Sequence, residues 1–145
     1  MTHTASSQDR HWTALFLAWL IALASMLGAI FLGEVVGIAP CVLCWYQRIA
    51  MFPLVVVLAI GLLPFDYRSV RYALPLALAG WAIALYHCLL YWGIIPKDLV
   101  PCGEGASCTD IKADLYGFIS VPLLSLTAFS IILVLLLTVK KGTPK

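Results

Sequence analysis

Charge is scarce in this sequence. Charged residues make up 11% of the 145-residue chain, less than half of the ~25% that is typical of soluble domains. The hydrophobic fraction of 63% and the mean hydropathy of +1.00 argue against a soluble enzyme and against a disordered chain. The net charge of +2 is too small to indicate a polyanionic partner such as a nucleic acid. The composition therefore predicts an integral membrane protein.

Acidic side chains are absent from the long hydrophobic runs of the chain. A helix needs about 20 apolar residues to cross a ~30 Å hydrocarbon layer, and four runs meet this length: 12–33, 45–63, 72–95 and 115–139. These runs are continuous rather than alternating, which favours helices over the strands of a membrane barrel. The sequence predicts an all-α, four-helix transmembrane bundle that forms a single membrane domain over residues 1–145.

No clear small-residue cleavage site follows the first run, so we interpret it as a retained helix rather than a signal peptide. Basic residues cluster on one side of the predicted spans: Arg10, Arg68, Arg71, Lys140, Lys141 and Lys145. The other side has Lys97 and Lys112 in loops and Arg48 inside a helix end. By the positive-inside rule, both termini are expected in the cytoplasm, and membrane lipid is the expected surrounding.

Four of the five cysteines form two pairs on the predicted outer side of the membrane. Cys41 and Cys44 form the motif C-V-L-C where the first outer loop meets the second helix. Cys102 and Cys108 lie in the second outer loop, within P-C-G-E-G-A-S-C. Two pairs that face an oxidising compartment indicate disulfide chemistry.

The C-x-x-C spacing at a helix start lets both sulfurs approach bonding distance. The free N–H groups and the dipole of that helix end also favour thiolate over thiol. Arg48 follows Cys44 by four residues and therefore shares its helical face one turn deeper. This cation is expected to stabilise a Cys44 thiolate and is a candidate to hold an electronegative ligand oxygen.

The second pair lies in a loop rich in glycine and small residues, in which an exposed disulfide is open to attack by the thiolate of a partner. After this loop, Ile111, Leu115 and Phe118 recur at helical spacing. This pattern predicts a short amphipathic helix on the membrane surface before the fourth span.

Small residues recur at helical spacing in two of the spans. Gly80, Ala84 and Cys88 do so in the third span, and Ala24 and Gly28 do so in the first. Such stripes permit helices to approach closely. We therefore interpret Cys88 as a packing residue.

Each candidate site residue has an alternative interpretation. The cysteine pairs are also consistent with structural staples, or with four thiolates that hold zinc. Arg48 is also consistent with an interfacial anchor whose charge reaches the headgroups. His87, the ionisable imidazole of the third span, is either a hydrogen-bonded packing residue or a group that lines a cofactor site.

Several segments together resemble the DsbB disulfide bond formation proteins. P-C-V-L-C-W-Y-Q-R, residues 40–48, opens the second of four helices as in that family. Three later segments resemble its short BdbC-type branch: A-L-Y-H at 84–87, C-G-E-G-A-S-C at 102–108 and Y-G-F-I-S-V-P-L-L-S-L at 116–126. Only five residues separate the second cysteine pair, as in that branch and unlike the longer members. The resemblance extends from the first helix to the fourth.

The resemblance implies a thiol:quinone oxidoreductase of the bacterial cell (inner) membrane. Its expected partner is an extracytoplasmic thioredoxin-like dithiol oxidase of the DsbA or BdbD type, and its expected cofactor is menaquinone or ubiquinone. Cys102 would be attacked by the partner, and the released Cys108 would attack Cys41. The residues expected at the quinone are Cys44 as a thiolate, Arg48 at a quinone oxygen and His87 near the head group.

Two other functions compete with this interpretation. A membrane metal-binding or transport protein would use the paired cysteines to capture a soft cation. However, all four paired cysteines lie on one predicted side, and no acidic residue lies within a span. A quinone-linked protein of the vitamin K epoxide reductase type is the other alternative, and the C-x-x-C at the start of the second helix favours the DsbB type over it.

Overall fold

The computed structural model describes residues 2–63, 66–95 and 120–141. Cys102, Cys108 and the predicted surface helix at Ile111, Leu115 and Phe118 lie outside the described residues. The described regular structure is helical, in the order α1 (Thr2–Ile30), the π-helical turn η1 (Phe31–Val35), α2 (Val42–Leu62), α3 (Ser69–Tyr91) and α4 (Val121–Lys141). Four described segments are long and apolar enough to cross a membrane: Gln8–Val35, Val42–Leu62, Ser69–Tyr91 and Val121–Lys141. This confirms the all-α, four-helix prediction.

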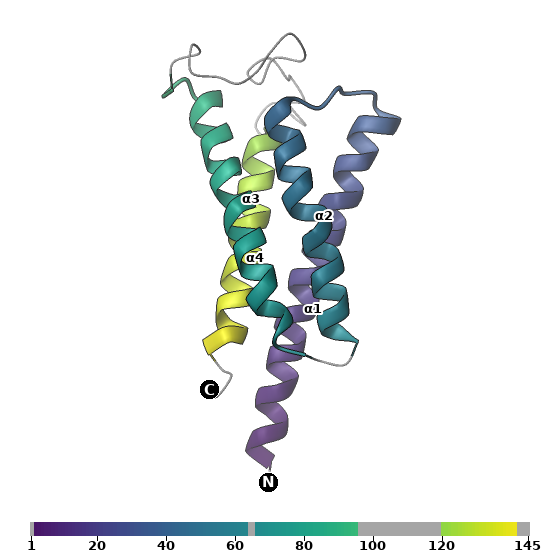
Figure 1. Ribbon diagram of the computed structural model, residues 1–145, viewed down its shortest axis with the longest axis vertical. Coiled ribbons are helices and arrows are strands. Elements are labelled where there is room, and N and C mark those ends of the chain that lie inside the picture. The colour runs from purple at the N-terminus through teal and green to yellow at the C-terminus, as the bar shows by residue number, and fades with distance from the viewer. Residues whose placement is uncertain (1, 64–65, 96–119, 142–145) are drawn as a thin grey trace.

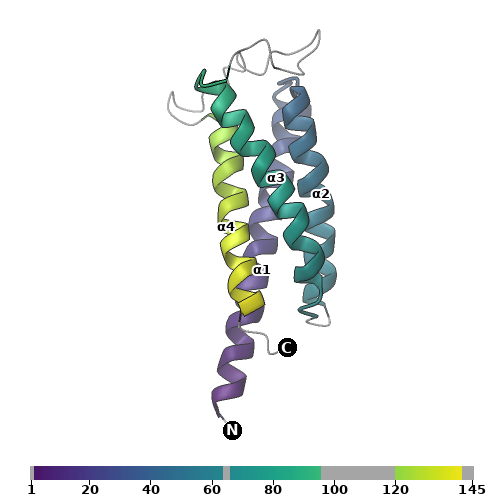
Figure 2. The same ribbon diagram turned by 60° about the vertical axis from the view of Figure 1, so that its left-hand side comes forward.

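The helices form a closed bundle in which each α-helix packs against two others (Figures 1 and 2). Helix α2 contacts α1 and α3, and α4 contacts the same two helices from the other side. Helix α1 begins and α4 ends at one end of the bundle, and α1 extends beyond its neighbours there (Figure 1). The starts of α2 and α4 and the end of α3 lie at the opposite end, which brings the first cysteine pair close to the end of α3.

Local sequence accounts for where α2 begins and where α3 ends. Pro40 precedes α2, and Cys41 caps it, because the Cys41 sulfur accepts a hydrogen bond from the backbone N–H of Cys44 at 3.3 Å. Helix α3 ends at Tyr91, and Gly93 then takes a φ of +71°, a conformation that glycine adopts without strain. The helix therefore ends four residues before the predicted limit of the third span.

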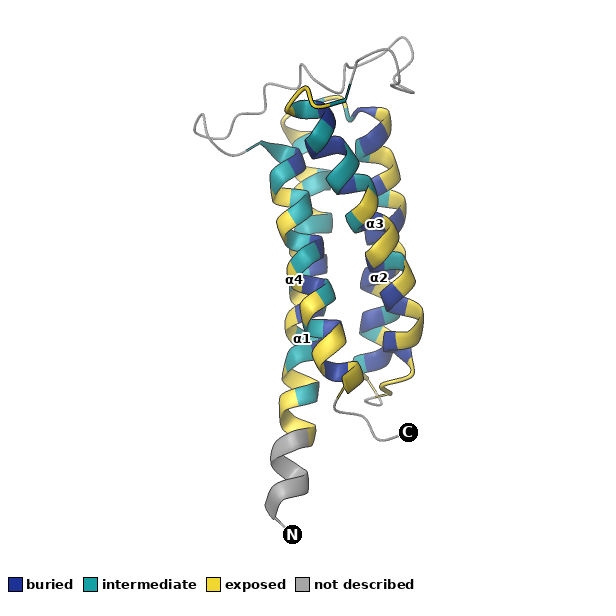
Figure 3. Ribbon diagram, turned by 90° about the vertical axis from the view of Figure 1, so that its left-hand side faces the viewer, coloured by how far each residue is buried: buried dark blue, intermediate teal, exposed yellow. Residues whose placement is uncertain are grey.

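The core is built from apolar side chains that point into the bundle. Leu15 of α1, Leu54 and Leu58 of α2, and Phe129 and Leu136 of α4 are fully buried. Figure 3 shows buried positions facing inward along the helices and exposed positions on the outer surface. Many of the exposed side chains are large and apolar, as expected for a surface that meets lipid.

Small residues serve two different purposes in this bundle. Gly80 lets α3 approach α4, because a Cβ at this position would overlap the Phe129 ring. Cys88 is a buried free thiol on the same helix, in agreement with its interpretation as a packing residue. Gly28, by contrast, has no atom within 4 Å of an added Cβ, and with Ala24 it lines a cavity. The stripe of small residues in α1 therefore borders open space, and it does not bring a neighbouring helix into close contact.

Candidate functional site

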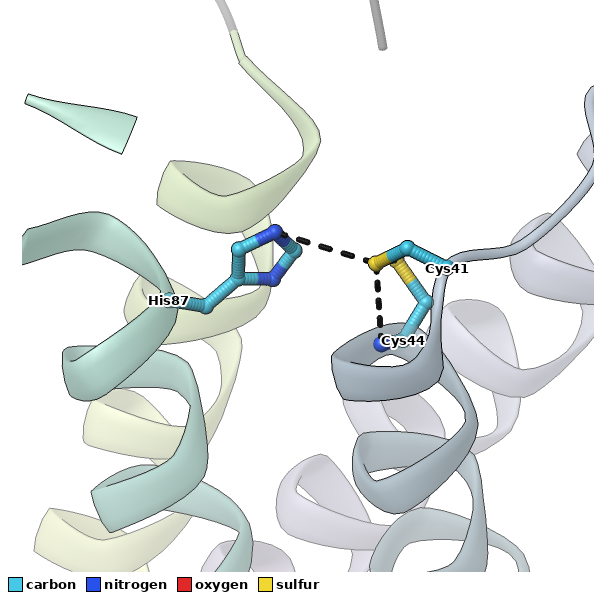
Figure 4. A group of neighbouring side chains, drawn as sticks. All are labelled: Cys41, Cys44 and His87. Atoms are coloured by element: carbon cyan, nitrogen blue, oxygen red, sulfur yellow. Dashed lines mark hydrogen bonds between the residues drawn. The ribbon is translucent and has the colours of Figure 1, made fainter. Parts of the chain in front are cut away.

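Cys41 and Cys44 lie side by side at the start of α2, where one helical turn separates them (Figure 4). Their sulfur atoms are 2.8 Å apart. Cys41 is buried, with 2% of its surface exposed, whereas Cys44 is half-buried. The geometry brings two thiols into direct contact, as disulfide chemistry requires.

His87 reaches the same place from α3 (Figure 4). Its ring is buried, and its Nε2 lies 3.9 Å from the Cys41 sulfur. On the other side of the ring, Nδ1 lies 3.2 Å from the amide Nε2 of Gln47. The amide Oε1 of Gln47 in turn accepts a hydrogen bond from the Ser125 hydroxyl at 2.6 Å. A chain of polar contacts thus runs from α4 through α2 and α3 to the Cys41 sulfur.

These contacts favour the thiolate form of Cys41. The Cys44 side chain has the largest effect in lowering the pKa of Cys41, because its S–H donates to the Cys41 sulfur. Burial raises this pKa, but the contacts with His87 and the Cys44 backbone N–H lower it further. The pKa of Cys41 is therefore well below the ordinary value of a thiol. The sequence analysis expected the thiolate at Cys44, but in the reduced pair of this structure Cys44 is the protonated donor and Cys41 is the thiolate.

Cys44 lines a cavity of about 500 Å³ that lies between α1, α2 and α4. Most of its lining is apolar, with Ile21, Met51 and Phe52 among the residues that form it. The lining also includes polar groups, four of which bear on the site: Cys44, Gln47, Arg48 and Ser125. Neither Cys41 nor His87 lines the cavity. The two cysteines therefore have different surroundings. Gln47 and Ser125 belong to both, because they line the cavity and also form part of the chain of polar contacts that leads to Cys41.

Arg48 is held at the cavity by α1 and by its own helix. Its Nη2 donates a hydrogen bond to the Ala29 carbonyl at 2.6 Å, and its Cζ lies 5.3 Å from the centroid of the Trp45 ring. Gly33 leaves the space for the guanidinium, because an added Cβ would lie 3.1 Å from Nη2. Gly33 belongs to the π-helical turn η1, where the regular α-helical bonding pattern changes.

The structure brings Cys41, Cys44, Arg48 and His87 together at one end of the bundle. Sequence reasoning did not assign a role to Gln47, which appeared there only as a member of the P-C-V-L-C-W-Y-Q-R segment. A polar amide within an apolar span is a signal that could have identified it, since such groups find partners across helices. Ser125 appeared there only within the segment at 116–126, and the same signal applies to it.

Comparisons with known proteins identify the family of this chain. Residues 10–139 match the family model described as "Disulfide bond formation protein DsbB". A "Probable disulfide formation protein" of Metapseudomonas resinovorans is 50% identical over 133 residues, which cover 91% of this chain and 92% of that protein. The "Disulfide bond formation protein C" of Bacillus subtilis is 37% identical over 126 residues, which cover 87% and 91% of the two chains.

A further relative, the "Probable disulfide formation protein" of Deinococcus radiodurans, is 37% identical over 132 residues and 86% of each chain. No solved structure gives a significant match. The family match covers all four membrane-spanning helices nearly completely and includes the cysteine pair of α2. Together with the helices and the paired thiols, these matches indicate a multi-pass membrane thiol oxidoreductase that acts in disulfide bond formation. The chain belongs to the DsbB family of disulfide bond formation proteins.

Proposed function

We propose that this protein transfers electrons from a reduced extracytoplasmic dithiol protein to a membrane quinone, and that the whole chain acts as one membrane domain. The observation that carries this proposal is the position of Cys44. It forms one half of a sulfur pair, and it also lines an apolar cavity beside Arg48. A thiol in this position has a thiol partner on one side and room for a membrane-soluble acceptor on the other.

The thiol steps use ordinary disulfide exchange. A thiolate of a partner of the DsbA or BdbD type attacks the Cys102–Cys108 disulfide at Cys102. A mixed disulfide between the partner and Cys102 forms, and Cys108 leaves as a thiolate. This thiolate attacks Cys41, so the Cys41–Cys44 bond breaks, a Cys41–Cys108 bond forms and Cys44 leaves as a thiolate. Each exchange forms one disulfide and breaks another, and no electrons are lost from the set of thiols. The two electrons therefore need an acceptor outside it.

The cavity residues fit a quinone head group. A volume of about 500 Å³ with a mainly apolar lining lies in the range of small-molecule sites. Arg48 offers guanidinium N–H groups beyond the one that bonds Ala29, and these suit a quinone oxygen and its developing negative charge. When bound, menaquinone or ubiquinone would supply a two-electron acceptor next to Cys44. His87 does not line the cavity, and its described contacts are with Cys41 and Gln47 behind the cysteine pair.

We propose an orientation with both termini in the cytoplasm and the cysteine pairs outside. The distribution of Lys and Arg in the short flanks supports this orientation. The bundle is compatible with it, since the cysteine pair of α2 and the start of α1 lie at opposite ends. An oxidising compartment on the cysteine side is where disulfides form and persist.

The test follows quinone absorbance after the purified protein is mixed with a reduced thioredoxin-like dithiol protein. Cys44→Ser and Cys102→Ser are expected to abolish quinone reduction, because each removes one end of the thiol path. Cys88→Ser is the matched control, since Cys88 is also a buried thiol at this end of α3 but belongs to neither pair. Full activity without Cys44 or Cys102, or no activity with several competent dithiol donors and both quinone classes, would contradict the proposal.

A metal site is the second candidate function, because ligand atoms of Cys41, Cys44 and His87 all lie within 4.8 Å of one another. Two thiolates bound tetrahedrally to one zinc ion are about 3.8 Å apart, given Zn–S bonds of about 2.3 Å. The two sulfurs here are 2.8 Å apart, so they would have to separate to share an ion. Arg48→Ala distinguishes the two functions, because it is expected to weaken quinone binding and to leave zinc binding intact.

A further inference from the structure

The polar contacts behind the cysteine pair support a further inference. It rests on the proposed function and assigns roles to two more residues. Gln47 is buried in α2 with 7% of its surface exposed, yet its amide has partners on both sides. The partners lie on two other helices, Ser125 on α4 and His87 on α3. An amide that joins three helices at one point has a fixed orientation.

That orientation determines which nitrogen of His87 carries the proton. The Ser125 hydroxyl donates to Oε1 of Gln47, which turns the amide nitrogen of Gln47 toward Nδ1 of His87. An amide nitrogen can only donate, so Nδ1 must accept. In the neutral ring the proton then lies on Nε2, which is the atom that faces the Cys41 sulfur at 3.9 Å.

We propose that Gln47 and Ser125 are positioning residues that hold His87 with its Nε2–H directed at Cys41, so that Cys41 leaves as a stabilised thiolate. After the first exchange Cys102 is bonded to the partner, and the partner's second thiolate breaks this bond by forming the partner's own disulfide, which frees Cys102 as a thiolate. In the return step, the Cys102 thiolate attacks Cys108 in the Cys41–Cys108 disulfide. A Cys102–Cys108 bond forms, the Cys41–Cys108 bond breaks, and Cys41 keeps the electron pair. No electrons are gained or lost overall, and a hydrogen bond to the departing sulfur speeds its departure.

The groups that face His87 support this assignment. Among the described contacts of His87, the Cys41 and Cys44 sulfurs lie beside the ring from the α2 end, and the Gln47 amide, which the Ser125 hydroxyl holds, is uncharged. Arg48 lies at the cavity, where it bonds the Ala29 carbonyl of α1. The lowered pKa of Cys41, to which the His87 contact contributes, agrees with a donor at this sulfur.

The test is a pH titration of the Cys41 thiolate by its ultraviolet absorbance, in the full chain without quinone or a dithiol donor. The background keeps Cys41 alone by replacing four residues with alanine: Cys44, Cys88, Cys102 and Cys108. In this background Gln47→Leu is expected to raise the titration midpoint, with about tenfold less thiolate at a given pH for each unit of the shift. His87→Phe is expected to raise it at least as much.

Ser125 provides a second, milder probe. Ser125→Ala is expected to raise the midpoint less than Gln47→Leu, and Ser125→Thr, which keeps the hydroxyl, is expected to restore it. Ser130→Ala is the matched control: it also removes an α4 hydroxyl, but one that bonds Leu126 and Trp81 instead. It should leave the midpoint unchanged.

Two results would overturn the inference. If His87→Phe raises the midpoint while Gln47→Leu and Ser125→Ala do not, His87 acts without them. If none of the three variants moves the midpoint, the contact with Cys41 does not stabilise the thiolate. Because the titration uses neither quinone nor donor, either result leaves the proposed electron transfer standing. Conversely, a failed quinone assay leaves the titration interpretable.

Discussion

Cys41 and Cys44 are three residues apart in sequence, yet their sulfurs meet different surroundings. Cys41 is buried against the imidazole of His87, within a chain of hydrogen bonds that ends on α4. Cys44 lines an apolar cavity between α1, α2 and α4, beside the Arg48 guanidinium. One sulfur therefore has fixed polar contacts, and the other faces open apolar space.

The difference suits the two kinds of chemistry that the proposed function requires of one short motif. Disulfide exchange at Cys41 needs a leaving thiolate that is stabilised by nearby donors. Transfer to a membrane-soluble acceptor at Cys44 needs space and a cation that meets developing charge. Because the motif opens a helix, its two sulfurs are presented to different neighbouring helices.

The largest expected effect concerns the cavity beside Cys44. Arg48→Met should weaken quinone binding about 10- to 100-fold, because a hydrogen bond from a charged donor contributes about 1.5–3 kcal/mol. A quinone titration followed by intrinsic fluorescence measures this affinity. The affinity of Arg48→Lys is expected to lie between those of the unsubstituted protein and Arg48→Met. Disulfide exchange of the Arg48→Met protein with a dithiol partner should stay unchanged. Unaltered quinone affinity would contradict the assignment of Arg48.

Gly80 of α3 packs against the ring of Phe129, which also lines the cavity beside Cys44. Gly80→Ala should lower the free energy of unfolding by about 1–3 kcal/mol, the usual cost of overpacking. Thermal unfolding in detergent, followed by circular dichroism, measures the change. Gly28→Ala is the matched control, since nothing lies within 4 Å of its added Cβ. Equal stabilities of the two variants would show that Phe129 yields to the added methyl group.

The pH dependence of the reduction potential of the Cys41–Cys44 disulfide tests the surroundings of Cys41. Because the pKa of Cys41 is lowered, reduction of the disulfide near neutral pH takes up two electrons but one proton. The midpoint potential should therefore fall by about 30 mV per pH unit as the pH rises, since each proton in a two-electron couple contributes about 30 mV. Equilibration with thiol redox buffers measures it. A slope twice as steep would mean that both thiols are neutral.

The smallest expected effect concerns the fit of Arg48 against η1. Gly33→Ala places a Cβ 3.1 Å from the Arg48 Nη2, so the guanidinium must shift by a few tenths of an ångström. Quinone affinity should fall by less than in Arg48→Met, and the titration of Cys41 should not change. A shifted Cys41 titration would mean that the two surroundings are coupled.

Much of the fold could be predicted from the sequence because membrane helices depend on local composition. The four apolar runs require internal backbone hydrogen bonds in lipid, so their existence followed from length and hydropathy. Their ends were less accurate. The third span was expected to reach residue 95, but α3 ends at Tyr91, since Gly93 turns the chain. Composition measures apolarity, and the residues after Tyr91 remain apolar although they are not helical.

The site could be predicted where its residues share one motif. Cys41, Cys44 and Arg48 have fixed spacing on one helix, so their proximity followed from the sequence. Gln47 lies in the same segment, but its role depends on His87 of α3 and Ser125 of α4, which are 40 and 78 residues away in the chain. No local pattern determines such contacts.

The sequence by itself determined four membrane helices, a thiol pair at the start of one of them and a cation one turn deeper. It could do so because apolar length and helical spacing are local properties. Tertiary structure alone decided that His87 faces Cys41 and that the cavity opens beside Cys44. It also decided that the α1 stripe with Gly28 leaves space while Gly80 makes contact. These outcomes depend on which helix faces each sulfur and each glycine, and that is set by the packing of the whole bundle.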